Sequence, residues 1–302
     1  MMRNILITGG NGLVGKELSD LLVENKYNIR ILTRNPKKSS KYEEYLWSPK
    51  EGIIDPEAIK NTYAIIHLAG AGIADERWTD KRKKELYSSR IDTANLLYKI
   101  CEEIKYFPEV FISASGIGIY GADSGNEWQV EDQKEIGEDF IATLSKAWEK
   151  AAYYFAERGS RVVYLRTGIV LSKKGGALSK LALPARLGLA APLGSGSQYM
   201  SWIHMSDLIN MYLFALDKNI KGAYNAVATN PVTNKEFMKL ISKALSRPFF
   251  LPKIPSFLLK LGLGELADIL LGGNRVSNEK IIHEGFTFNY PELNSALNNI
   301  LG

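Results

Sequence analysis

The chain has 302 residues, which is enough for two domains or for one α/β core with an appendage. Its 45% hydrophobic and 24% charged residues are ordinary for a soluble globular protein, so collagen-like, coiled-coil and largely disordered chains are excluded. The formal net charge of +5 is mild and predicts neither a nucleic-acid nor a membrane partner. One cysteine, Cys101, and three histidines predict no disulfide framework, no metal site and a reducing compartment.

No secretory or membrane-spanning segment is predicted. The apolar run after Arg3 is short and soon meets glycines, which differs from a secretory signal. The most apolar later stretch, residues 254–271, carries three charged side chains and so does not fit a membrane span. The expected location is therefore the cytoplasm.

Strands and helices alternate through the first half of the chain. Asn4–Thr8 predicts a strand buried on both faces, and apolar residues spaced three and four apart from Leu13 predict a helix to about Asn25. Further strands are predicted at 28–33, near 45–47, and at 63–68, 109–114 and 162–165, with helices between 79 and 104 and at 138–157. This alternation is typical of an α/β fold with a Rossmann-type, doubly wound parallel sheet.

The pattern of long alternating strands and helices ends after residue 170. Residues 1–170 are predicted to form the nucleotide-binding Rossmann domain. Glycine-rich loops around shorter elements then predict a smaller mixed α/β substrate part at 171–246, some segments of which return to the core. Prolines followed by a leucine-rich helix predict a small helical appendage at 247–302. In the first domain, the basic run from Lys81 to Lys84 is interpreted as a solvated helix face.

The predicted first strand runs into the loop Gly-Gly-Asn-Gly-Leu-Val-Gly and then directly into a helix. This is the context of a dinucleotide-binding loop. The alternative, a glycine-rich turn without a ligand, would explain the spacing alone but not the strand before it and the helix after it. Gly9 permits the tight turn, Gly12 lets the backbone approach a pyrophosphate, and Gly15 lets helix and strand pack closely. Leu13 and Val14 begin the helix, whose N-terminus offers unpaired N–H groups and partial positive charge to phosphates.

The end of the second predicted strand indicates which dinucleotide is bound. An acidic residue there would accept a hydrogen bond from a ribose 2′-hydroxyl, but this chain has Thr33 and Arg34. An arginine can form two charge-assisted hydrogen bonds to a 2′-phosphate, so NADP (NADPH) is predicted rather than NAD. The alternative is that Arg34 is a solvent-facing side chain with no ligand.

The glycine spacing and several later motifs resemble the extended short-chain dehydrogenase/reductase (SDR) superfamily. The loop is similar to its Thr-Gly-x-x-Gly-x-x-Gly pattern. The stretch from His67 to Gly70 resembles its motif after the fourth strand, whose backbone passes the adenosine and ribose of the cofactor. The resemblance therefore adds Leu68, Ala69 and Gly70 to the predicted cofactor site, together with Arg166 of a Leu-Arg-Thr-Gly motif.

Further pieces are similar to one atypical branch of NAD(P)-dependent epimerase/dehydratase-like proteins, called the epimerase family. Its members carry a small C-terminal domain of unknown function. The pieces are Arg77-Trp78-Thr79, Ser89-Arg90, Trp148-Glu149, Gly194-Ser195-Gly196, Trp202-Ile203-His204, Arg247-Pro248, Arg275-Val276 and Gly285-Phe286. The resemblance covers essentially the whole chain.

The chain departs from the superfamily at the catalytic pair. That pair is Tyr-x-x-x-Lys, in which the lysine lowers the tyrosine pKa so that the phenolate can act as a base. Here no tyrosine lies four residues before Lys146. Alignment of Glu149 with the glutamate that follows the motif puts Ile141 and Ser145 at the two positions. The usual proton-transfer pair is therefore expected to be absent.

Five residues are predicted to serve the substrate. Ser115 lies near the carboxyl end of the fifth strand, where the superfamily keeps a substrate-orienting hydroxyl, and it is the one catalytic candidate. Tyr120, Gln198, Trp202 and His204 are predicted to line the pocket. Each has an alternative: an ordinary strand-end serine, a core aromatic, or a structural histidine.

The leading interpretation is an NADP-binding oxidoreductase or epimerase-like protein that acts on an unidentified small molecule, with a nucleotide sugar as one candidate. The alternative is a catalytically silent NADP sensor or protein-interaction module. A serine hydrolase is disfavoured because the chain has no Gly-x-Ser-x-Gly elbow. A homodimer is compatible with the resemblance, and the sequence leaves the oligomeric state open.

Overall fold

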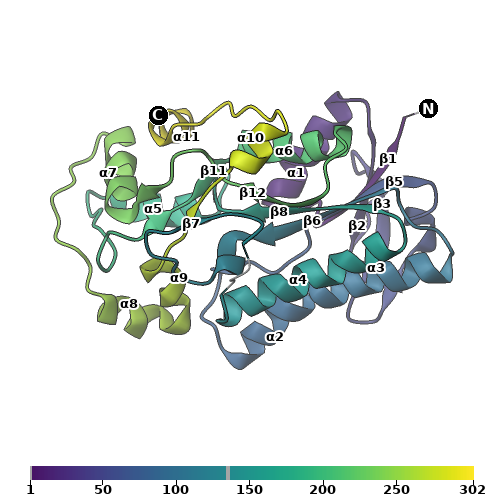
Figure 1. The fold of residues 1–302 in the computed structure, drawn as a ribbon, viewed down its shortest axis with the longest axis horizontal. Helices are drawn as coiled ribbons and strands as arrows, with labels where there is room; N and C mark the ends of the chain where they lie inside the picture. Colours follow the sequence, from purple (N-terminus) through teal and green to yellow (C-terminus); the bar gives the residue numbers. More distant parts are fainter. Residues whose placement is uncertain (1, 134–136) are drawn as a thin grey trace.

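Short apolar runs form the strands of one eight-stranded sheet in the computed structural model, which describes residues 2–133 and 137–302 (Figure 1). The strand order is β12-β8-β6-β5-β1-β2-β3-β4, and every pair except β3 with β4 is parallel. The strands are β1 (Asn4–Thr8), β2 (Asn28–Thr33), β3 (Glu43–Ser48), β4 (Ile53–Ile54), β5 (Thr62–His67), β6 (Val110–Gly116), β8 (Arg161–Thr167) and β12 (Gly222–Ala226). The predicted α/β, Rossmann-type fold is confirmed.

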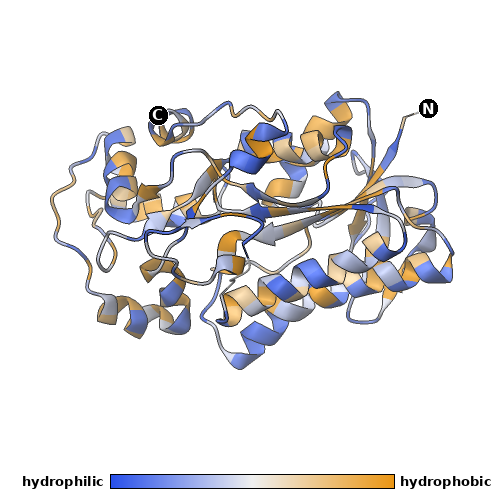
Figure 2. Cartoon of the chain, in the orientation of Figure 1, coloured by the Kyte–Doolittle hydropathy of each residue, from blue (hydrophilic) through white to orange (hydrophobic). Residues whose placement is uncertain are grey.

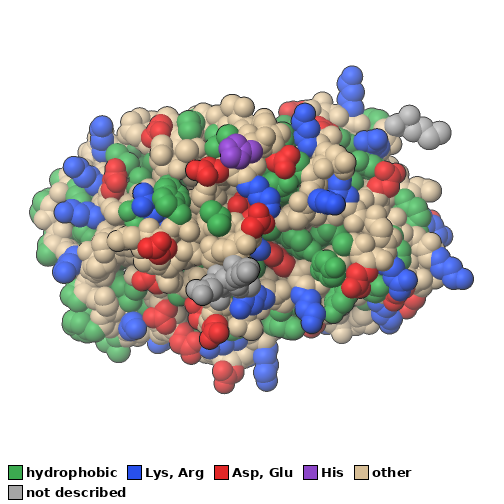
Figure 3. Space-filling model, in the orientation of Figure 1, with side chains coloured by type: hydrophobic (Ala, Val, Ile, Leu, Met, Phe, Trp, Pro, Cys, Tyr) green, Lys and Arg blue, Asp and Glu red, His purple; other side chains and the backbone are tan. Residues whose placement is uncertain are grey.

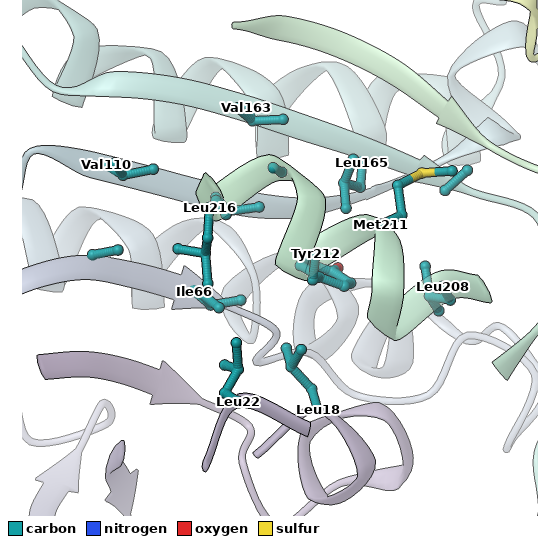
Figure 4. Close-up of a cluster of buried hydrophobic side chains, with 14 of the residues drawn as sticks. Leu18, Leu22, Ile66, Val110, Val163, Leu165, Leu208, Met211, Tyr212 and Leu216 are labelled. Atoms are coloured by element: carbon teal, nitrogen blue, oxygen red, sulfur yellow. The ribbon is translucent and has the colours of Figure 1, made fainter. Parts of the chain in front are cut away.

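Helices cover both faces of this sheet, because each presents one apolar side to it. The helices α1 (Leu13–Glu24) and α6 (Met205–Asp217) pack on one face, where Leu18, Leu22 and Tyr212 meet strand residues such as Ile66 (Figure 4). The helices α3 (Ile91–Glu103) and α4 (Phe140–Glu157) lie on the other face, and their hydrophobic and hydrophilic residues alternate in Figure 2. The doubly wound arrangement thus buries the central strands on both sides.

The helix expected between residues 79 and 104 is two helices, α2 (Asp80–Ser88) and α3. They separate at Arg90, whose buried guanidinium donates to the carbonyl oxygens of Leu86 at 3.0 Å and Ala71 at 2.8 Å. The Arg90 side chain therefore points into the fold at the junction of the two helices. The apolar spacing of the sequence could not predict this break, because it depends on a contact with Ala71, which is far away in the chain.

The basic run at the start of α2 is only partly solvated. Lys81 and Lys84 are exposed, but Arg82 is buried and donates to the Gly72 carbonyl at 2.6 Å and the Glu85 carboxylate at 2.8 Å. The interpretation as a solvated face is therefore wrong for Arg82. Its Nη1 and Nη2 atoms find acceptors inside the fold, which offsets part of the cost of burying the charge, while its Nε has no partner among the described residues.

Short strand pairs and helices build the second half of the molecule. The strands β9 (Ile169–Leu171) and β11 (Trp202–His204) pair in parallel, as do β7 (Trp128–Gln129) and β14 (Arg275–Val276), while β10 (Tyr199–Met200) and β13 (Val232–Thr233) pair antiparallel. The helices are α5 (Ala177–Arg186), α7 (Asn234–Ala244), α8 (Ser256–Leu263), α9 (Ala267–Leu271), α10 (Glu279–His283) and α11 (Leu293–Leu301). In the part of the chain that the structure describes, no helix has the length and hydropathy needed to cross a membrane.

Candidate functional site

The glycine loop between β1 and α1 is built so that side chains would not fit. Gly9 has a φ of +69°, and a Cβ atom there would lie 3.0 Å from the backbone of Leu68. A Cβ atom at Gly15 would lie 2.4 Å from the carbonyl oxygen of Gly9, closer than real contacts allow. The loop is closed by a hydrogen bond from the Gly12 N–H to the Gly9 carbonyl at 2.9 Å. Strand, loop and helix are thus packed backbone against backbone.

The helix that follows has free N–H groups at its start. Gly12 is the N-cap of α1 and has no side chain that could accept a hydrogen bond from the first turn. The first intrahelical hydrogen bond runs from the Lys16 N–H to the Gly12 carbonyl at 3.2 Å. The N–H groups of Leu13 and Val14 come before it and so have no acceptor within the helix. These groups and the helix dipole favour an anion at this end.

Arg34 follows β2 at the same edge of the sheet. Its side chain is exposed, and it makes no ion pair or hydrogen bond with the described residues. Thr33 lies next to the glycine loop, where its hydroxyl oxygen is 3.4 Å from the side-chain nitrogen of Asn11. The guanidinium is therefore available to a ligand that extends from the loop along the end of β2.

The loop after β5 packs directly on the glycine loop. The Thr8 hydroxyl oxygen accepts hydrogen bonds from the backbone N–H groups of Leu68 at 3.2 Å and Ala69 at 3.1 Å. The same oxygen lies 2.8 Å from His67 Nδ1. Complete burial lowers the pKa of His67 to about 4, so the imidazole is neutral at physiological pH. Leu68, Ala69 and the following Gly70 are thus held beside Gly9.

A buried ion pair lies at the carboxyl ends of β6 and β8. The Arg166 guanidinium donates to both oxygens of the Glu149 carboxylate, through Nε at 2.8 Å and Nη2 at 2.9 Å. The Ser115 hydroxyl donates to the same carboxylate at 2.7 Å. Although burial opposes the charge, the bonds to Glu149 raise the pKa of Arg166. Ser115 therefore has an oriented proton and free lone pairs on its oxygen.

Tyr120 extends this network toward β12. Its hydroxyl donates to the Asn225 side chain at 2.7 Å and accepts from Arg166 at 3.1 Å. Burial raises the pKa of Tyr120 to about 12, so this phenol stays protonated. The Glu131 carboxylate accepts from the Asn225 backbone N–H at 2.7 Å, and burial raises its pKa as well. We call Ser115, Glu149, Arg166, Tyr120 and Asn225 the buried polar network.

The two positions that the alignment assigns to the missing pair hold no acid or base. Ile141 is buried, and a Cβ atom at Gly118 would lie 2.6 Å from its side chain. The Ser145 hydroxyl donates to the Ile141 carbonyl at 2.8 Å, within the helix. An apolar side chain packed on Gly118 thus fills the position expected for the catalytic tyrosine.

The other predicted pocket residues are engaged by the protein itself. Gln198 donates to the carbonyls of Leu193 and Leu270, and Trp202 is fully buried with its indole N–H 3.2 Å from the Asn230 carbonyl. His204 Nδ1 accepts the Ser206 N–H at 3.1 Å, which caps α6, and burial lowers the pKa of His204. His204 also lines a cavity of about 180 Å³ that Ser115 and Tyr120 do not line. The structure thus joins Ser115, Tyr120 and Arg166 but leaves Gln198, Trp202 and His204 outside that network.

Two members of the buried polar network were not among the predicted site residues. Glu149 was quoted in a Trp-Glu motif and used to align the missing catalytic pair, but it was not predicted to contact Ser115, which lies on β6 while Glu149 lies on α4. Asn225 comes from β12, whose register places it beside Arg166. That pairing joins segments far apart in the chain, and no local pattern indicates it.

The parallel sheet, with a glycine loop between its first strand and first helix, defines a Rossmann-type α/β protein. The family model described as the NAD dependent epimerase/dehydratase family matches residues 5–226, and a domain of unknown function, DUF1731, matches residues 254–300. The chain belongs to the NAD dependent epimerase/dehydratase family. The resemblance drawn from the sequence motifs is confirmed.

Similar proteins extend over the full length. Epimerase family protein YfhF of Bacillus subtilis is 34% identical over 300 residues, covering 99% of this chain and 98% of that protein. Epimerase family protein SDR39U1 of Mus musculus is 34% identical over 301 residues, covering 98% and 99%. The crystal structure of the human epimerase family protein SDR39U1 (isoform 2) with NADPH has a TM-score of 0.87 and 31% identity, and 99% of each chain is covered.

Proposed function

We propose that this chain binds NADP(H) and acts as an oxidoreductase or epimerase-like enzyme on a small molecule that is still to be identified. The observation that carries the proposal is the glycine loop with Arg34 free beside it. The backbone contacts at Gly9 and Gly15 leave no room for side chains, as a pyrophosphate-binding turn requires. The NADPH in the human relative supports the choice of cofactor.

The residues present fit this cofactor. The N–H groups of Leu13 and Val14 would hold the pyrophosphate, and Arg34 with Thr33 would hold the ribose 2′-phosphate. The backbone of Leu68 to Gly70 would lie against the adenosine and ribose of the cofactor. When bound, the nicotinamide supplies or accepts a hydride, and the protein's part is to orient the substrate and manage a proton.

A substrate hydroxyl group would meet Ser115 rather than a tyrosinate. The Ser115 hydroxyl donates its hydrogen bond to Glu149, so its oxygen is left to accept a hydrogen bond from a substrate hydroxyl or amine. Tyr120 cannot replace the family base, because burial raises its pKa to about 12 and its hydroxyl already donates a hydrogen bond to the Asn225 side chain. A small alcohol, of which a nucleotide sugar is one example, therefore suits this edge of the sheet.

Cofactor choice is tested by titrating the protein with NADPH and NADH and following nicotinamide fluorescence. We expect Arg34→Ala to weaken NADPH binding about 30-fold or more, since one charge-assisted hydrogen bond contributes about 2 kcal/mol. NADH binding should change little. Lys38→Ala is the matched control, because Lys38 is also an exposed cation in the same loop. Equal losses for both nucleotides would refute the assignment of Arg34.

A second candidate function is a catalytically silent NADP(H) sensor. The observation in its favour is Ile141, which fills the expected tyrosine position, with Ser145 at the expected lysine position. Nicotinamide absorbance measured with sugar nucleotides and small carbonyl compounds separates the two functions. Turnover that Ser115→Ala lowers would support the enzyme, and tight NADPH binding with no turnover on any of these would support the sensor. The buried free thiol of Cys101 suits the proposed cytoplasmic location.

A further inference from the structure

Large apolar side chains are exposed along one edge of the second half of the molecule. Four of them are more than two-thirds accessible to solvent: Leu187 at 70%, Phe250 at 73%, Phe257 at 67% and Leu261 at 75%. Figure 3 shows hydrophobic side chains gathered at the lower left, where Figure 1 places α8. We call the following set the C-terminal apolar face: Leu187, Leu189, Phe250, Phe257, Leu258 and Leu261.

The helix α8 contributes most of this face and has an unusual composition for its position. Its sequence is Ser-Phe-Leu-Leu-Lys-Leu-Gly-Leu, yet none of its eight residues is buried. A surface helix of a globular protein normally turns such leucines toward the core. Isolated exposed leucines need no explanation, but a contiguous apolar group on one helix marks a surface that something else covers.

The face is held in place by backbone contacts. Residues 187–194 and 248–254 run side by side, with a parallel bridge between Leu193 and Ile254. The Ile254 N–H donates to the Pro192 carbonyl at 2.8 Å, and the Gly194 N–H donates to the Ile254 carbonyl at 2.9 Å. This pairing brings the segment with Leu189 beside the segment with Phe250 and leads directly into α8.

The segment that contains α7 and α8 is rich in basic residues. Residues 235–263 contain six basic side chains and one acidic side chain, Glu236. This segment therefore carries a formal net charge of +5, the same as the whole chain. Arg247 and Lys253 are exposed, and neither has a carboxylate partner among the described residues. Lys260 pairs with Asp268 at 3.3 Å.

We propose that the C-terminal apolar face docks on an anionic lipid surface. Exposed phenylalanine and leucine side chains next to unpaired lysine and arginine are the combination that enters the interface of an anionic bilayer. A second copy of this chain fits less well, because it would bring two segments of charge +5 together. An acidic peptide would need a groove, whereas these side chains project from a helix and a loop.

This proposal departs from the expectation drawn from the overall charge. A net charge of +5 spread over 302 residues predicts no membrane partner, but exposed, unpaired cations such as Arg247 and Lys253 close in sequence to exposed apolar side chains favour one. The contact is peripheral, since no helix in the described ranges can span a bilayer. It does not depend on the cofactor site, so the two proposals can fail separately.

The test is sedimentation of the full chain with vesicles of phosphatidylcholine alone and with added phosphatidylserine. We expect binding to the anionic vesicles, weakened by salt, and little binding to the neutral ones. Phe257→Ser with Leu261→Ser should lower the partition coefficient about tenfold or more, because each buried side chain contributes strongly. Arg247→Gln and Lys253→Gln should lower it about fivefold each.

Matched controls separate docking from general stickiness or misfolding. Val23→Ser with Tyr153→Ser removes exposed apolar side chains elsewhere, at 41% and 53% exposure, and should leave vesicle binding unchanged. NADPH binding and thermal unfolding of the Phe257/Leu261 variant should match the parent chain. Equal binding to both vesicles, no binding to either, or an equal loss in the control variant would overturn the proposal. Self-association abolished by the Phe257/Leu261 changes, without vesicle binding, would replace it with a dimer.

Discussion

Removal of the Glu149 carboxylate tests the buried polar network most directly. In Glu149→Ala, the Arg166 side chain, which is 9% exposed, keeps its charge and loses the bonds at 2.8 and 2.9 Å. Breaking one partner of a buried ion pair costs about 3–5 kcal/mol, because the other charge is left uncompensated. Ser115 also loses its acceptor, which adds about 1 kcal/mol. We therefore expect the free energy of unfolding to fall by about 4–6 kcal/mol.

Urea denaturation followed by circular dichroism measures this loss. The comparison is Glu103→Ala, which removes an exposed pair with Lys99 and should cost about 0–1 kcal/mol. Replacing both buried partners, as Glu149→Leu with Arg166→Met, should recover much of the stability, since no unpaired charge remains. A loss below about 1 kcal/mol in Glu149→Ala would refute the conclusion that the pair is buried and mutually dependent.

Two further predictions concern the nucleotide-binding half. Gly15→Ala places a methyl group 2.4 Å from the Gly9 carbonyl, so the melting curve should show a loss of about 1–3 kcal/mol, whereas Gly262→Ala, with open space around it, should show none. An unchanged melting temperature in Gly15→Ala would contradict the observed packing. The pKa of His67 is depressed from 6.5 to about 4, so the unfolded chain binds the extra proton first and stability should fall as pH drops through this window. The loss should reach about 3 kcal/mol and vanish in His67→Gln but persist in His283→Gln, as urea titrations at several pH values would reveal.

The nucleotide-binding half could be predicted closely from the sequence. The strands Asn4–Thr8 and Asn28–Thr33 lie where the apolar runs placed them, because strands buried on both faces leave a continuous signal. The helix beginning at Leu13 was equally clear, since its apolar spacing follows directly on a glycine loop. Local patterns sufficed here because each feature is decided by residues near one another in the chain.

The buried polar network could not be predicted in the same way. The sequence assigned Arg166 to the cofactor, which stays a prediction, while the structure pairs its guanidinium with Glu149 from the neighbouring helix. Arg82 and Arg90 were missed for a related reason: a basic residue is buried only where distant carbonyls accept its hydrogen bonds. Such acceptors are fixed by tertiary packing and leave no periodic trace.

The edge strand β12 is the last strand of the large sheet to be synthesised, which affects the order in which the sheet can form. β8 is complete once residue 167 has left the ribosome, but its outer edge pairs with β12, at residues 222–226. Until then the nascent chain carries an open, apolar strand edge, and Arg166 lacks the Asn225 side of its surroundings. The large sheet therefore reaches its full width only after residue 226 has been synthesised, and the edge of β8 stays open for pairing with other strands until then.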